Sequence, residues 1–580
     1  MTRLIFNVLE PRERIRLLLV FVMVATGALL ETLSISIVIP VVQAVLGTDT
    51  RKDHPWIPAW IDQLPFIQFV QLLMAVLVLA FLFKNLFVFG SIYIQQRFQF
   101  AIVNRISQRL FETYLRQPFE FHLQTPSSIL VRNIEEYPRA FVSQGVTPII
   151  AVLSDLTTGV GLLIILILVN PMATTVFVGT FGLCGYLITS VSRGRAQRWG
   201  AERIKHRGVI LDMLLAGLGG VKEIQLFGRA TLVVDTHRKS LHEAARSGYM
   251  FQLLQNSPRA FFEVAAVGGV ALLIIGASIQ RESFKDVAVV IALFGVVAFR
   301  MLPAVNRVIQ ANQQMRYGRT AIVAAVDDMS LPVLAAVSRH EARTDAFQRV
   351  ELRDLRYAYP KSDVVVSDIK FLSVLAGESL GIIGKSGSGK STFVDLILGI
   401  LTPTSGTVVV NGKNIADDPR YWQDRIGYVP QHVYLMDTTV RRNVAFGLPE
   451  KVISDADVEK ALRLANLWDF VQTLPKGLNT EVGERGVRLS GGQRQRLGIA
   501  RALYGNPEVI VLDEATSALD SETEREIVES FREIANERTL IVVAHRTSTL
   551  AHCSRLIRLE NGRIVQDGTY EDVIGSLSAS

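Results

Sequence analysis

The stretch Gly384-Lys-Ser-Gly-Ser-Gly-Lys-Ser-Thr392 decides the fold of the second half of this chain. It follows the apolar run Ser379–Ile383 and precedes a helix-like run over residues 393–398. A glycine-rich loop between a strand and a helix is the setting in which the pattern G-x-x-x-x-G-K-S binds phosphate groups. Backbone N–H groups and the positive end of the helix would then surround phosphate oxygens. The stretch therefore predicts a nucleotide-binding α/β domain, and the alternative is an ordinary glycine turn before a helix.

The residues of this loop have separate predicted roles. Lys390 can reach the β- and γ-phosphates of a nucleotide, and Ser391 can offer its hydroxyl group to Mg²⁺. The loop thus implies a nucleotide together with a magnesium ion. The other predicted contacts to the nucleotide are Gly384, Ser386, Gly387, Gly389 and Thr392.

A second motif supplies two carboxylates. The apolar run Val509–Leu512 has the pattern of a buried strand and is followed by Asp513 and Glu514. Such a strand would deliver Asp513 beside the Ser391 hydroxyl, where it can hold the Mg²⁺ shell. Glu514 is one residue further, at the position for polarising an attacking water molecule. A strand that ends in Asp-Glu is common by chance, but it is less common at domain-scale distance after a phosphate loop.

The composition indicates a membrane domain joined to a soluble one. The chain has 580 residues, too many for one core, and 49% of them are hydrophobic, concentrated in the first half. The formal net charge is +7. Much of the basic excess flanks the apolar runs, as the positive-inside rule expects, so it does not indicate nucleic acid. The two cysteines, Cys184 and Cys553, imply no disulfide framework.

Six apolar segments are long enough to span a bilayer. They cover residues 15–46, 66–94, 141–169, 172–191, 260–279 and 287–309. An even number of spans puts both termini on one side, and the arginine-rich connections after the second and fourth spans put that side in the cytoplasm. Glu31 lies at membrane depth, where an ionisable residue is either functional or pairs two helices.

The segments outside the spans complete the predicted organisation. Residues 1–315 form a transmembrane domain, residues 316–346 a linker, and residues 347–580 a nucleotide-binding domain of alternating strands and helices. Leu4–Arg16 is predicted as an interfacial helix, with a polar tail as the alternative. Trp56–Leu64 is predicted as a short helix at the outer surface.

Between the two nucleotide motifs lies Leu489-Ser490-Gly491-Gly492-Gln493, and with this pentapeptide the sequence resembles the ABC ATPase family. The resemblance implies ATP and Mg²⁺ as cofactors, and the pentapeptide as a contact to ATP. It also implies that Tyr359 stacks on adenine, that Gln431 senses the γ-phosphate and helps to hold the metal with Ser391 and Asp513, and that Asp520 belongs to a loop at the nucleotide. His545 matches the switch histidine, which makes Glu514, His545 and Lys390 the expected catalytic residues.

The same resemblance implies a dimer. Two such domains dock head to tail, so that each ATP lies between the phosphate loop of one copy and residues 490–492 of the other. Every element is intact in this chain, so one chain suffices for a homodimer with two competent sites, and a heterodimer is the alternative. Residues 480–486 resemble a motif of ABC exporters. On that likeness, the segments near Pro118–Leu130 and Gly217–Phe227 are coupling helices.

Four basic residues indicate the cargo. Lys84, Arg259, Arg300 and Arg307 fall in the inner half of their spans, where they would suit an anionic head group. The alternative is that they extend to the inner interface. The runs 31–40, 257–263 and 299–307 resemble PglK-type flippases of lipid-linked oligosaccharides, which use basic cavity residues toward a pyrophosphate. At Lys84 that family would have arginine.

The sequence thus predicts an α-helical transmembrane domain of exporter type followed by an α/β P-loop ABC ATPase domain. As a homodimer in a bacterial cytoplasmic (inner) membrane, it would use ATP to move a lipid-linked oligosaccharide from the inner to the outer leaflet. The expected partners are a second copy, the phospholipid bilayer and a lipid-linked anionic substrate, with no nucleic acid. Alternative functions are a lipid A, peptide or multidrug exporter, or a gated channel, which intact Glu514 and His545 argue against. A soluble ATPase acting on DNA is excluded by the six spans.

Overall fold

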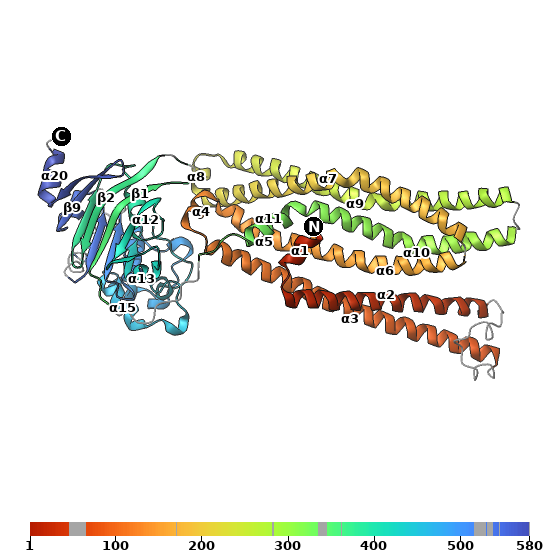
Figure 1. Cartoon of the computed structure of the whole chain (residues 1–580). Coiled ribbons are helices and arrows are strands. Elements are labelled where there is room, and N and C mark those ends of the chain that lie inside the picture. The colour runs from red at the N-terminus through yellow and green to blue at the C-terminus, as the bar shows by residue number, and fades with distance from the viewer. Residues whose placement is uncertain are drawn as a thin grey trace. The chain divides into compact units, whose positions relative to one another are not determined.

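The computed structural model describes residues 1–45, 65–169, 171–280, 284–334, 345–360, 362, 364–515, 529, 537–544 and 546–578 (Figure 1). The chain divides into two compact units. The first comprises residues 1–117 and 125–333, and the second comprises residues 118–124 and 334–580. Each unit is described below by itself.

The first unit is helical throughout its described part. Three of its helices have 50, 49 and 51 residues, about 75 Å each at 1.5 Å per residue. The hydrocarbon core of a bilayer is roughly 30 Å thick, so these helices continue well beyond it. The helices are α1 (Thr2–Val8), α2 (Pro11–Val45), α3 (Phe66–Leu115), α5 (Ser127–Phe141), α6 (Thr147–Val169), α7 (Pro171–Gly219), α8 (Val221–Leu226), α9 (Ala230–Gln280), α10 (Phe284–Tyr317) and α11 (Arg319–Met329), with a π-helical turn at Val142–Val146 between α5 and α6.

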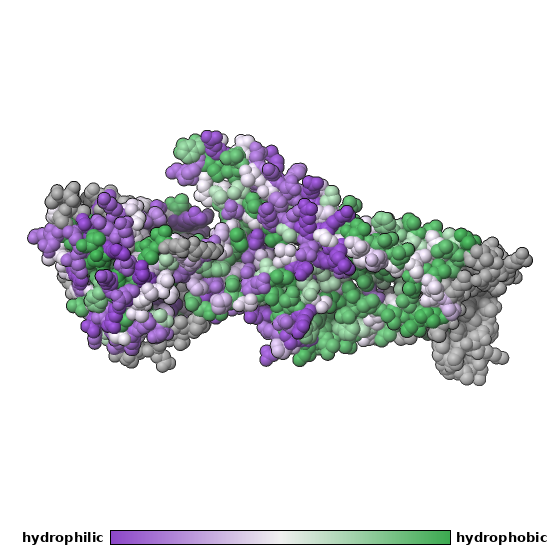
Figure 2. Space-filling view, turned by 45° about the horizontal axis from the view of Figure 1, so that its top comes forward, coloured by the Kyte–Doolittle hydropathy of each residue, from purple (hydrophilic) through white to green (hydrophobic). Residues whose placement is uncertain are grey.

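Apolar side chains face outward where the predicted spans lie. Four stretches of the described residues are long and apolar enough to cross a membrane: Phe66–Leu115, Ser127–Gly161, Thr174–Gly219 and Ala230–Ile275. On α3, for example, Leu86 is 70% exposed and Phe89 is 72% exposed. Figure 2 shows hydrophobic side chains gathered over one half of the long helices and hydrophilic ones over the other half. The predicted spans 15–46 and 287–309 coincide with α2 and α10, which include side chains outside the described set.

Pairs of long helices build this unit. α7 packs along α9, α2 along α3, and α10 against α6, α7 and α9 (Figure 1). Aromatic residues fill the core between α7, α9 and α10, where Phe177 stacks on Phe181 and Phe181 stacks on Phe262. α7 approaches the end of α10 so closely that a Cβ atom at Gly200 would lie 2.0 Å from the Tyr317 carbonyl oxygen.

The N-terminal segment forms two helices where the sequence predicts one. α1 ends at Val8, and Leu9 is extended, with ψ of 130°, before α2 begins at Pro11. Proline is favoured at the first helical position because it has no N–H to satisfy, so α2 can begin at Pro11. Ile5 and Leu9 are buried, whereas Phe6 is 48% exposed. This amphipathic pattern fits an interfacial helix, and the interfacial position stays a prediction.

The segment predicted as a linker begins with helical structure. α10 extends to Tyr317, and α11 follows after Gly318 with Ala321, Ile322 and Ala325 buried. Near the end of α11, the Asp328 carboxylate accepts hydrogen bonds from Tyr114 Oη (2.5 Å) and from Asn133 Nδ2 (3.1 Å). The part of the chain just before residue 333 is therefore fastened to α3 and α5. Residues 335–344 lie outside the described residues.

The second unit contains two sheets. The first sheet is antiparallel, with the order β2-β1-β4-β5, and the second has the order β10-β9-β3-β8-β7-β6, parallel except for β10. The strands are β1 (Arg349–Ala358), β2 (Val365–Leu375), β3 (Ser379–Ile383), β4 (Ser405–Val410), β5 (Lys413–Asn414), β6 (Ile426–Val429), β7 (Val509–Asp513), β8 (Thr539–Val543), β9 (Arg555–Glu560) and β10 (Arg563–Gly568).

Helices cover the parallel sheet, and both of its faces are apolar. Strands β3, β7 and β8 are almost wholly buried, as expected for parallel strands covered on two sides. One core forms around Phe393 of α12 and Trp422, and the other forms around Leu497 of α17. The helices of this unit are α4 (Phe119–Gln124), α12 (Lys390–Ile397), α13 (Pro419–Gln423), α14 (Val440–Val444), α15 (Asp455–Leu464), α16 (Trp468–Thr473), α17 (Gly491–Leu503), α19 (Thr547–Leu550) and α20 (Tyr570–Ser578), with short 3₁₀ turns at Glu450–Val452, Gly477–Asn479 and Glu484–Gly486.

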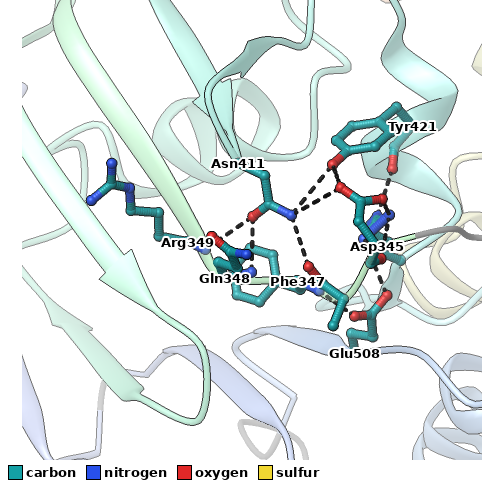
Figure 3. Close-up of polar contacts among 9 residues, drawn as sticks. Asp345, Phe347, Gln348, Arg349, Asn411, Tyr421 and Glu508 are labelled. Carbon is teal, nitrogen blue, oxygen red and sulfur yellow. Dashed lines mark hydrogen bonds and ion pairs between the residues drawn. The ribbon is translucent and has the colours of Figure 1, made fainter.

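A polar cluster fixes residues 345–347 of the second unit beside the amino ends of β6 and β7 (Figure 3). We call Asp345, Asn411, Tyr421, Arg425 and Glu508 the anchor network. The buried Arg425 guanidinium pairs with Asp345 at 2.7 Å and with Glu508 at 3.4 Å. Tyr421 Oη donates to the Asp345 carboxylate, and Asn411 Nδ2 donates to the Ala346 carbonyl at 2.8 Å. The network thereby holds the chain at residues 345–347 against the sheet.

Candidate nucleotide site

The carboxyl ends of four neighbouring parallel strands carry the predicted nucleotide residues. The glycine-rich loop follows β3, Asp513 ends β7, and Gln431 follows β6 by two residues. β8 lies between β3 and β7 and ends two residues before His545. Because parallel strands end at the same edge of a sheet, this edge brings the loop, the carboxylates and Gln431 together.

The Lys390 ammonium group is hydrogen-bonded to the backbone of the glycine-rich loop. Its Nζ donates to the Gly384 carbonyl at 2.8 Å and to the Lys385 carbonyl at 3.1 Å. Burial lowers the pKa of Lys390, while the nearby carboxylates Glu514 and Asp513 oppose that shift. The ammonium group is therefore held at the loop by carbonyl oxygens, which a phosphate oxygen can replace.

The backbone of the loop requires glycine at one point. Gly389 has φ of +96°, and a Cβ atom there would lie 2.7 Å from the Val366 carbonyl oxygen. This conformation starts α12 directly at Lys390, so that the helix N-terminus faces the loop. Inside the loop, the buried Ser388 hydroxyl has no hydrogen-bond partner among the described residues. A buried hydroxyl without a partner in a phosphate-type loop fits the binding of a phosphate oxygen.

Tyr359 reaches the same loop from the antiparallel sheet. Its hydroxyl is 3.0 Å from the Thr392 hydroxyl, and its ring meets Tyr357 edge to face at 5.1 Å. Thr392 is buried, whereas Ser391 beside it is exposed at the first turn of α12. The exposed Ser391 hydroxyl is therefore accessible to a metal ion, as the sequence predicts. The stacking of Tyr359 on adenine stays a prediction.

Glu514 and Gln431 meet at the edge of the sheet. Gln431 Nε2 donates to Glu514 Oε2 at 2.6 Å, which joins the segment after β6 to the end of β7. Glu514 has φ of +49°, and its N–H donates to the Val543 carbonyl of β8 at 2.9 Å. A left-handed conformation is uncommon outside glycine and is concentrated at functional sites. Here the neighbouring strand holds the backbone of Glu514 in place.

Asp513 shares its surroundings with a carboxylate that the sequence reasoning missed. Burial raises the pKa of Asp513, Glu514 raises it further, and Lys390 and a hydrogen bond from Tyr428 oppose the shift. Asp395 in α12 is half-buried, and burial together with Asp513 raises its pKa to about 6. The signal in the sequence was an acidic residue inside the apolar helical run that follows Ser391. Asp395 is four residues after Ser391 and therefore lies on the same face of the helix.

The donor set fits a magnesium nucleotide. Ser391, Asp513 and Gln431 offer the kind of oxygen ligand that Mg²⁺ prefers, and Lys390 and the loop could hold the phosphates. Within the described ranges, no group of three or more His, Cys, Asp or Glu side chains could hold a metal ion. A magnesium ion at this edge would therefore also depend on phosphate oxygens, as is usual for nucleotide-bound Mg²⁺.

The pentapeptide begins helix α17. Ser490 is its N-cap: Ser490 Oγ accepts from the Gln493 N–H at 3.2 Å, and Gln493 Oε1 accepts from the Ser490 N–H at 2.9 Å. This reciprocal pair is a capping box, so Gln493 has a structural role in the helix start. Leu489 is buried, and Gly491 and Gly492 form the first turn. A predicted contact of the pentapeptide with a nucleotide stays a prediction.

Several predicted residues fall outside the described set. Asp520 and His545 are not described, and neither is the segment Trp56–Leu64. Glu31 and Arg300 lie on α2 and α10, but their side chains are outside the described residues.

The remaining predicted cargo residues each have a neighbour in the structure. Lys84 Nζ lies 5.2 Å from the centre of the Phe81 ring, and Arg259 pairs with Glu263 on α9 at 3.1 Å. Arg307 pairs with Asp155 on α6, with Nη2 to Oδ1 at 2.6 Å. Sequence reasoning missed Asp155. The signal was a single acidic residue within the third apolar span, comparable to Glu31 in the first.

Two family models match this chain. The model described as "ABC transporter transmembrane region" matches residues 17–301, and the model described as "ABC transporter" matches residues 368–517. Similar curated proteins include the "ATP-dependent lipid A-core flippase" of Cupriavidus metallidurans, 31% identical over 519 residues that cover 86% of this chain and 84% of that protein. The flippase of the same name from Ralstonia nicotianae is 31% identical over 496 residues, 84% of this chain and 82% of that protein.

Solved structures agree on the fold. A bacterial Atm1-family ABC exporter with ATP bound superposes with a TM-score of 0.77 over 97% of this chain and 96% of that chain, at 23% identity. A helical transmembrane region followed by an α/β ATPase domain, as predicted from the sequence, is the organisation of an ABC exporter half-transporter that couples ATP hydrolysis to transport. The chain belongs to the ABC transporter family.

Proposed function

We propose that two copies of this chain form a homodimer in a bacterial inner membrane and export a phosphate-bearing amphiphilic lipid to the outer leaflet. The observation that carries the proposal is the similarity to lipid A-core flippases over more than four-fifths of both chains. The arginine-rich connections after the second and fourth spans support cytoplasmic termini and a cytoplasmic ATPase unit.

At the nucleotide edge, Lys390 and the loop bind the β- and γ-phosphates of ATP, and Ser391 and Asp513 hold Mg²⁺. Glu514 accepts a proton from the water that attacks the γ-phosphate, while Gln431 orients the Glu514 carboxylate through the hydrogen bond at 2.6 Å. A bound magnesium ion would offset phosphate charge at this edge of the sheet. His545 stabilises the γ-phosphate from the segment after β8.

The second copy completes each site. The capping box leaves the first turn of α17 with its N–H groups directed out of the helix, and Gly491 and Gly492 have no side chains to obstruct them. Such a helix start favours an anion. In the proposed dimer, Ser490, Gly491 and Gly492 of one copy therefore cap the γ-phosphate that the loop of the other copy holds.

The short helices α4 and α8 lie within the two segments predicted as coupling helices. Residues 118–124 group with the ATPase unit, and the Thr402 N–H donates to Glu120 Oε1 of α4 at 3.4 Å. We assign to α4 the transmission of ATPase closure to α3 and α5, which flank it in the chain. α8 would do the same for α7 and α9.

Two cargo candidates share a phosphate group. Lipid A-core is supported by the similar proteins, and a lipid-linked oligosaccharide is supported by the local likeness to PglK-type flippases at residues 31–40, 257–263 and 299–307. Arg300 on α10 is the residue we assign to the phosphate. A peptide or drug exporter is the remaining alternative.

The test is an ATPase and flipping assay in proteoliposomes supplied with lipid A-core, a polyprenyl-pyrophosphate oligosaccharide or a drug panel. Stimulation by one of the two phosphate-bearing lipids, with movement of that lipid between leaflets, is expected. Arg300→Ala should impair lipid transport and leave basal ATPase activity largely intact, whereas Arg198→Ala, in an exposed ion pair with Glu202, should change neither. Stimulation by drugs alone, or unchanged lipid transport in Arg300→Ala, would contradict the proposal.

A further inference from the structure

A cavity of about 270 Å³ lies between helices α2, α3, α6 and α10 of the membrane unit. Its apolar wall includes Val24, Ile92 and Ile150, and Gly27 leaves room where α2 passes α3. Hydroxyl and amide groups line it as well, from Ser91, Gln95, Thr147 and Ser154. Pockets that enclose drug-sized ligands span roughly 300–1,000 Å³, so this cavity suits the head group of an amphiphile and not the whole molecule.

The cavity contains an ion pair that joins two of these helices. Arg307 Nε lies 3.0 Å from both Asp155 carboxylate oxygens, and Nη2 lies 2.6 Å from Oδ1. The Asp155 side chain is 5% exposed, whereas that of Arg307 is 55% exposed. The carboxylate is therefore buried in the wall, and the guanidinium covers it from the open side.

On the predicted span bounds and orientation, the ion pair would lie in the inner half of the membrane. Asp155 is 14 residues before Val169, the end of α6, which is about 21 Å along a helix. Arg307 is 20 residues after Val287, about 30 Å along α10. Measured from the outer ends of these spans, both values fall in the inner half of a hydrocarbon core that is roughly 30 Å thick. The head group of a lipid in the cytoplasmic leaflet lies just outside the core, so it would enter the cavity from the inner side.

Charge balance restricts what the cavity can bind. Among the described residues, the charged side chains that line it are one carboxylate and one guanidinium, so this part of the lining is neutral. A ligand with only negative charge would draw Arg307 away and leave Asp155 buried and charged without its counter-ion, which is strongly unfavourable. A ligand with both charges can replace each partner of the pair, because its phosphate takes Arg307 and its ammonium takes Asp155.

We propose that this cavity is a head-group site for a zwitterionic lipid, with the phosphate bound by Arg307 and a primary ammonium bound by Asp155. The inference rests on the proposed function: it adds Arg307 to Arg300 as a phosphate-binding residue, and among phosphate-bearing lipids it favours a cargo with an amine beside a phosphate over one whose head group is purely anionic. Asp155 then acts as a specificity residue that disfavours purely anionic head groups. Arg307 would not bind an isolated anion, because Asp155 would lose its counter-ion.

Two matched lipids test the proposal on the full-length protein in a non-ionic detergent. Short-chain phosphatidylethanolamine has the phosphate and the ammonium, and its N-acetyl derivative keeps the phosphate and the acyl chains but lacks the positive charge. Binding is measured as the shift of the thermal unfolding midpoint, and function as ATPase stimulation. The wild type should respond to the zwitterionic lipid at a concentration about tenfold lower than to the N-acetylated lipid.

The variant Asp155→Asn separates charge selection from a structural role. With the carboxylate removed, Arg307 should favour the anionic lipid, so the order of the two half-maximal concentrations should reverse. A loosened contact between α6 and α10 would weaken both lipids equally and leave their ratio unchanged. Asp235→Asn is the matched control, because it removes a carboxylate from the exposed pair with Arg238 on α9 and should keep the wild-type ratio.

The outcomes distinguish this inference from the proposed function. Equal response of the wild type to both lipids, or an unchanged ratio in Asp155→Asn, would overturn the zwitterion site even if a lipid is transported. Glycerophosphoethanolamine, which lacks acyl chains, should compete weakly, and equal potency would overturn the assignment to a lipid. A selective midpoint shift without transport of any lipid would leave the site in place and contradict the exporter function proposed above.

Discussion

Glu514 has a strained backbone conformation that contacts with neighbouring residues hold in place. Its φ of +49° directs the chain away from β7, its N–H is fixed by β8, and its carboxylate is held by Gln431. A glutamate in this conformation costs stability relative to glycine, and such strained positions cluster at functional sites, which fits a role for the side chain. General-base catalysis at the γ-phosphate is the role that its place beside Asp513 and Lys390 supports.

Replacing Glu514 with glutamine should abolish most ATP turnover while preserving ATP binding. Loss of a general base costs about 10²–10⁴-fold in rate, and glutamine keeps the size and the hydrogen-bonding ability of the side chain. Turnover is measured by phosphate release and binding by a fluorescent ATP analogue. Glu571→Gln, at an exposed position of α20, serves as the control and should hydrolyse ATP normally. Vigorous hydrolysis by Glu514→Gln would refute the assignment.

Asp395 should make the stability of the ATPase unit depend on pH. Burial and Asp513 raise its pKa to about 6, above its ordinary value of 3.8, so the folded state holds a proton more tightly than the unfolded state. Wild-type stability therefore falls as the pH rises from about 4 to about 6. Asp395→Asn lacks this loss and should unfold about 2–4 °C higher than the wild type at pH 8, with a difference that disappears toward pH 4.

A second aspartate provides a control of opposite sign. Hydrogen bonds from the Thr569 hydroxyl and N–H lower the pKa of Asp572 at the start of α20. Its contribution is present above the unfolded pKa and is lost as the pH falls through the folded value. Asp572→Asn should therefore lower the unfolding midpoint at pH 8. If Asp395→Asn also lowered the midpoint at pH 8, the argument about its burial would be wrong.

Whether a site residue could be predicted from the sequence depended on the chemistry of its site. Lys390, Ser391, Asp513 and Glu514 were predictable because backbone-bound phosphate and metal chemistry constrain residue type at fixed spacing. Asp155 and Asp395 were not singled out, since each is a single carboxylate in an apolar run. The charged residue near each of them, Arg307 for Asp155 and Asp513 for Asp395, is more than 100 residues away in the sequence. Gln493 was predicted as a nucleotide contact, but its visible role is in the capping box.

At the scale of elements, strands β6 and β7 connect two polar regions. At their amino ends, Arg425 and Glu508 belong to the anchor network, and at their carboxyl ends lie Gln431 and Glu514. The two strands pair in register from Ile426 with Val509 to Val429 with Leu512. The chain segment that enters the ATPase unit is thus bound to the same two strands that position Glu514, the proposed general base.

Arg425→Ala should destabilise the ATPase unit by about 3 kcal/mol, near the lower end for a broken buried ion pair, because Asp345 and Glu508 keep partial access to water. The matched control is Arg420→Ala on α13, whose exposed pair with Asp424 should contribute less than about 1 kcal/mol. Thermal or chemical unfolding of the full-length protein measures both. Equal effects of the two substitutions would mean that the anchor network contributes no more than a surface pair.

Element types were predictable where the apolar pattern was long, and less so at their ends. Buried strands such as Val509–Leu512 and apolar spans of about 20 residues have distinctive patterns. The break at Leu9 and the helix α11 depend on contacts with distant residues, including Glu13 with Arg105 and Asp328 with Tyr114. The π-helical turn at residues 142–146 has no signal in the sequence that we could identify, although Gly145 packs closely against Ile5.

At the scale of the whole molecule, the two predicted halves of an ATP site begin at different elements of the ATPase unit. The phosphate loop lies at the end of β3, and the pentapeptide begins α17 after a long insertion between β6 and β7. Two-fold symmetry would pair the loop of each copy with the pentapeptide of the other and so form two identical sites. This arrangement is a proposal, and mixing two inactive variants tests it directly.

Lys390→Ala should lose phosphate binding at its own loop, and Ser490→Arg should block the pentapeptide, so that each variant is inactive as a homodimer. When the two variants are co-expressed, a mixed dimer has one site with both defects and one site with an intact loop and an intact pentapeptide. Random assembly makes about half of the dimers mixed, so ATPase activity up to about a quarter of the wild-type value should return. Differently tagged subunits and sequential purification would isolate the mixed dimers. If each site were formed within a single copy, the mixed dimers would contain two defective sites and no activity would return.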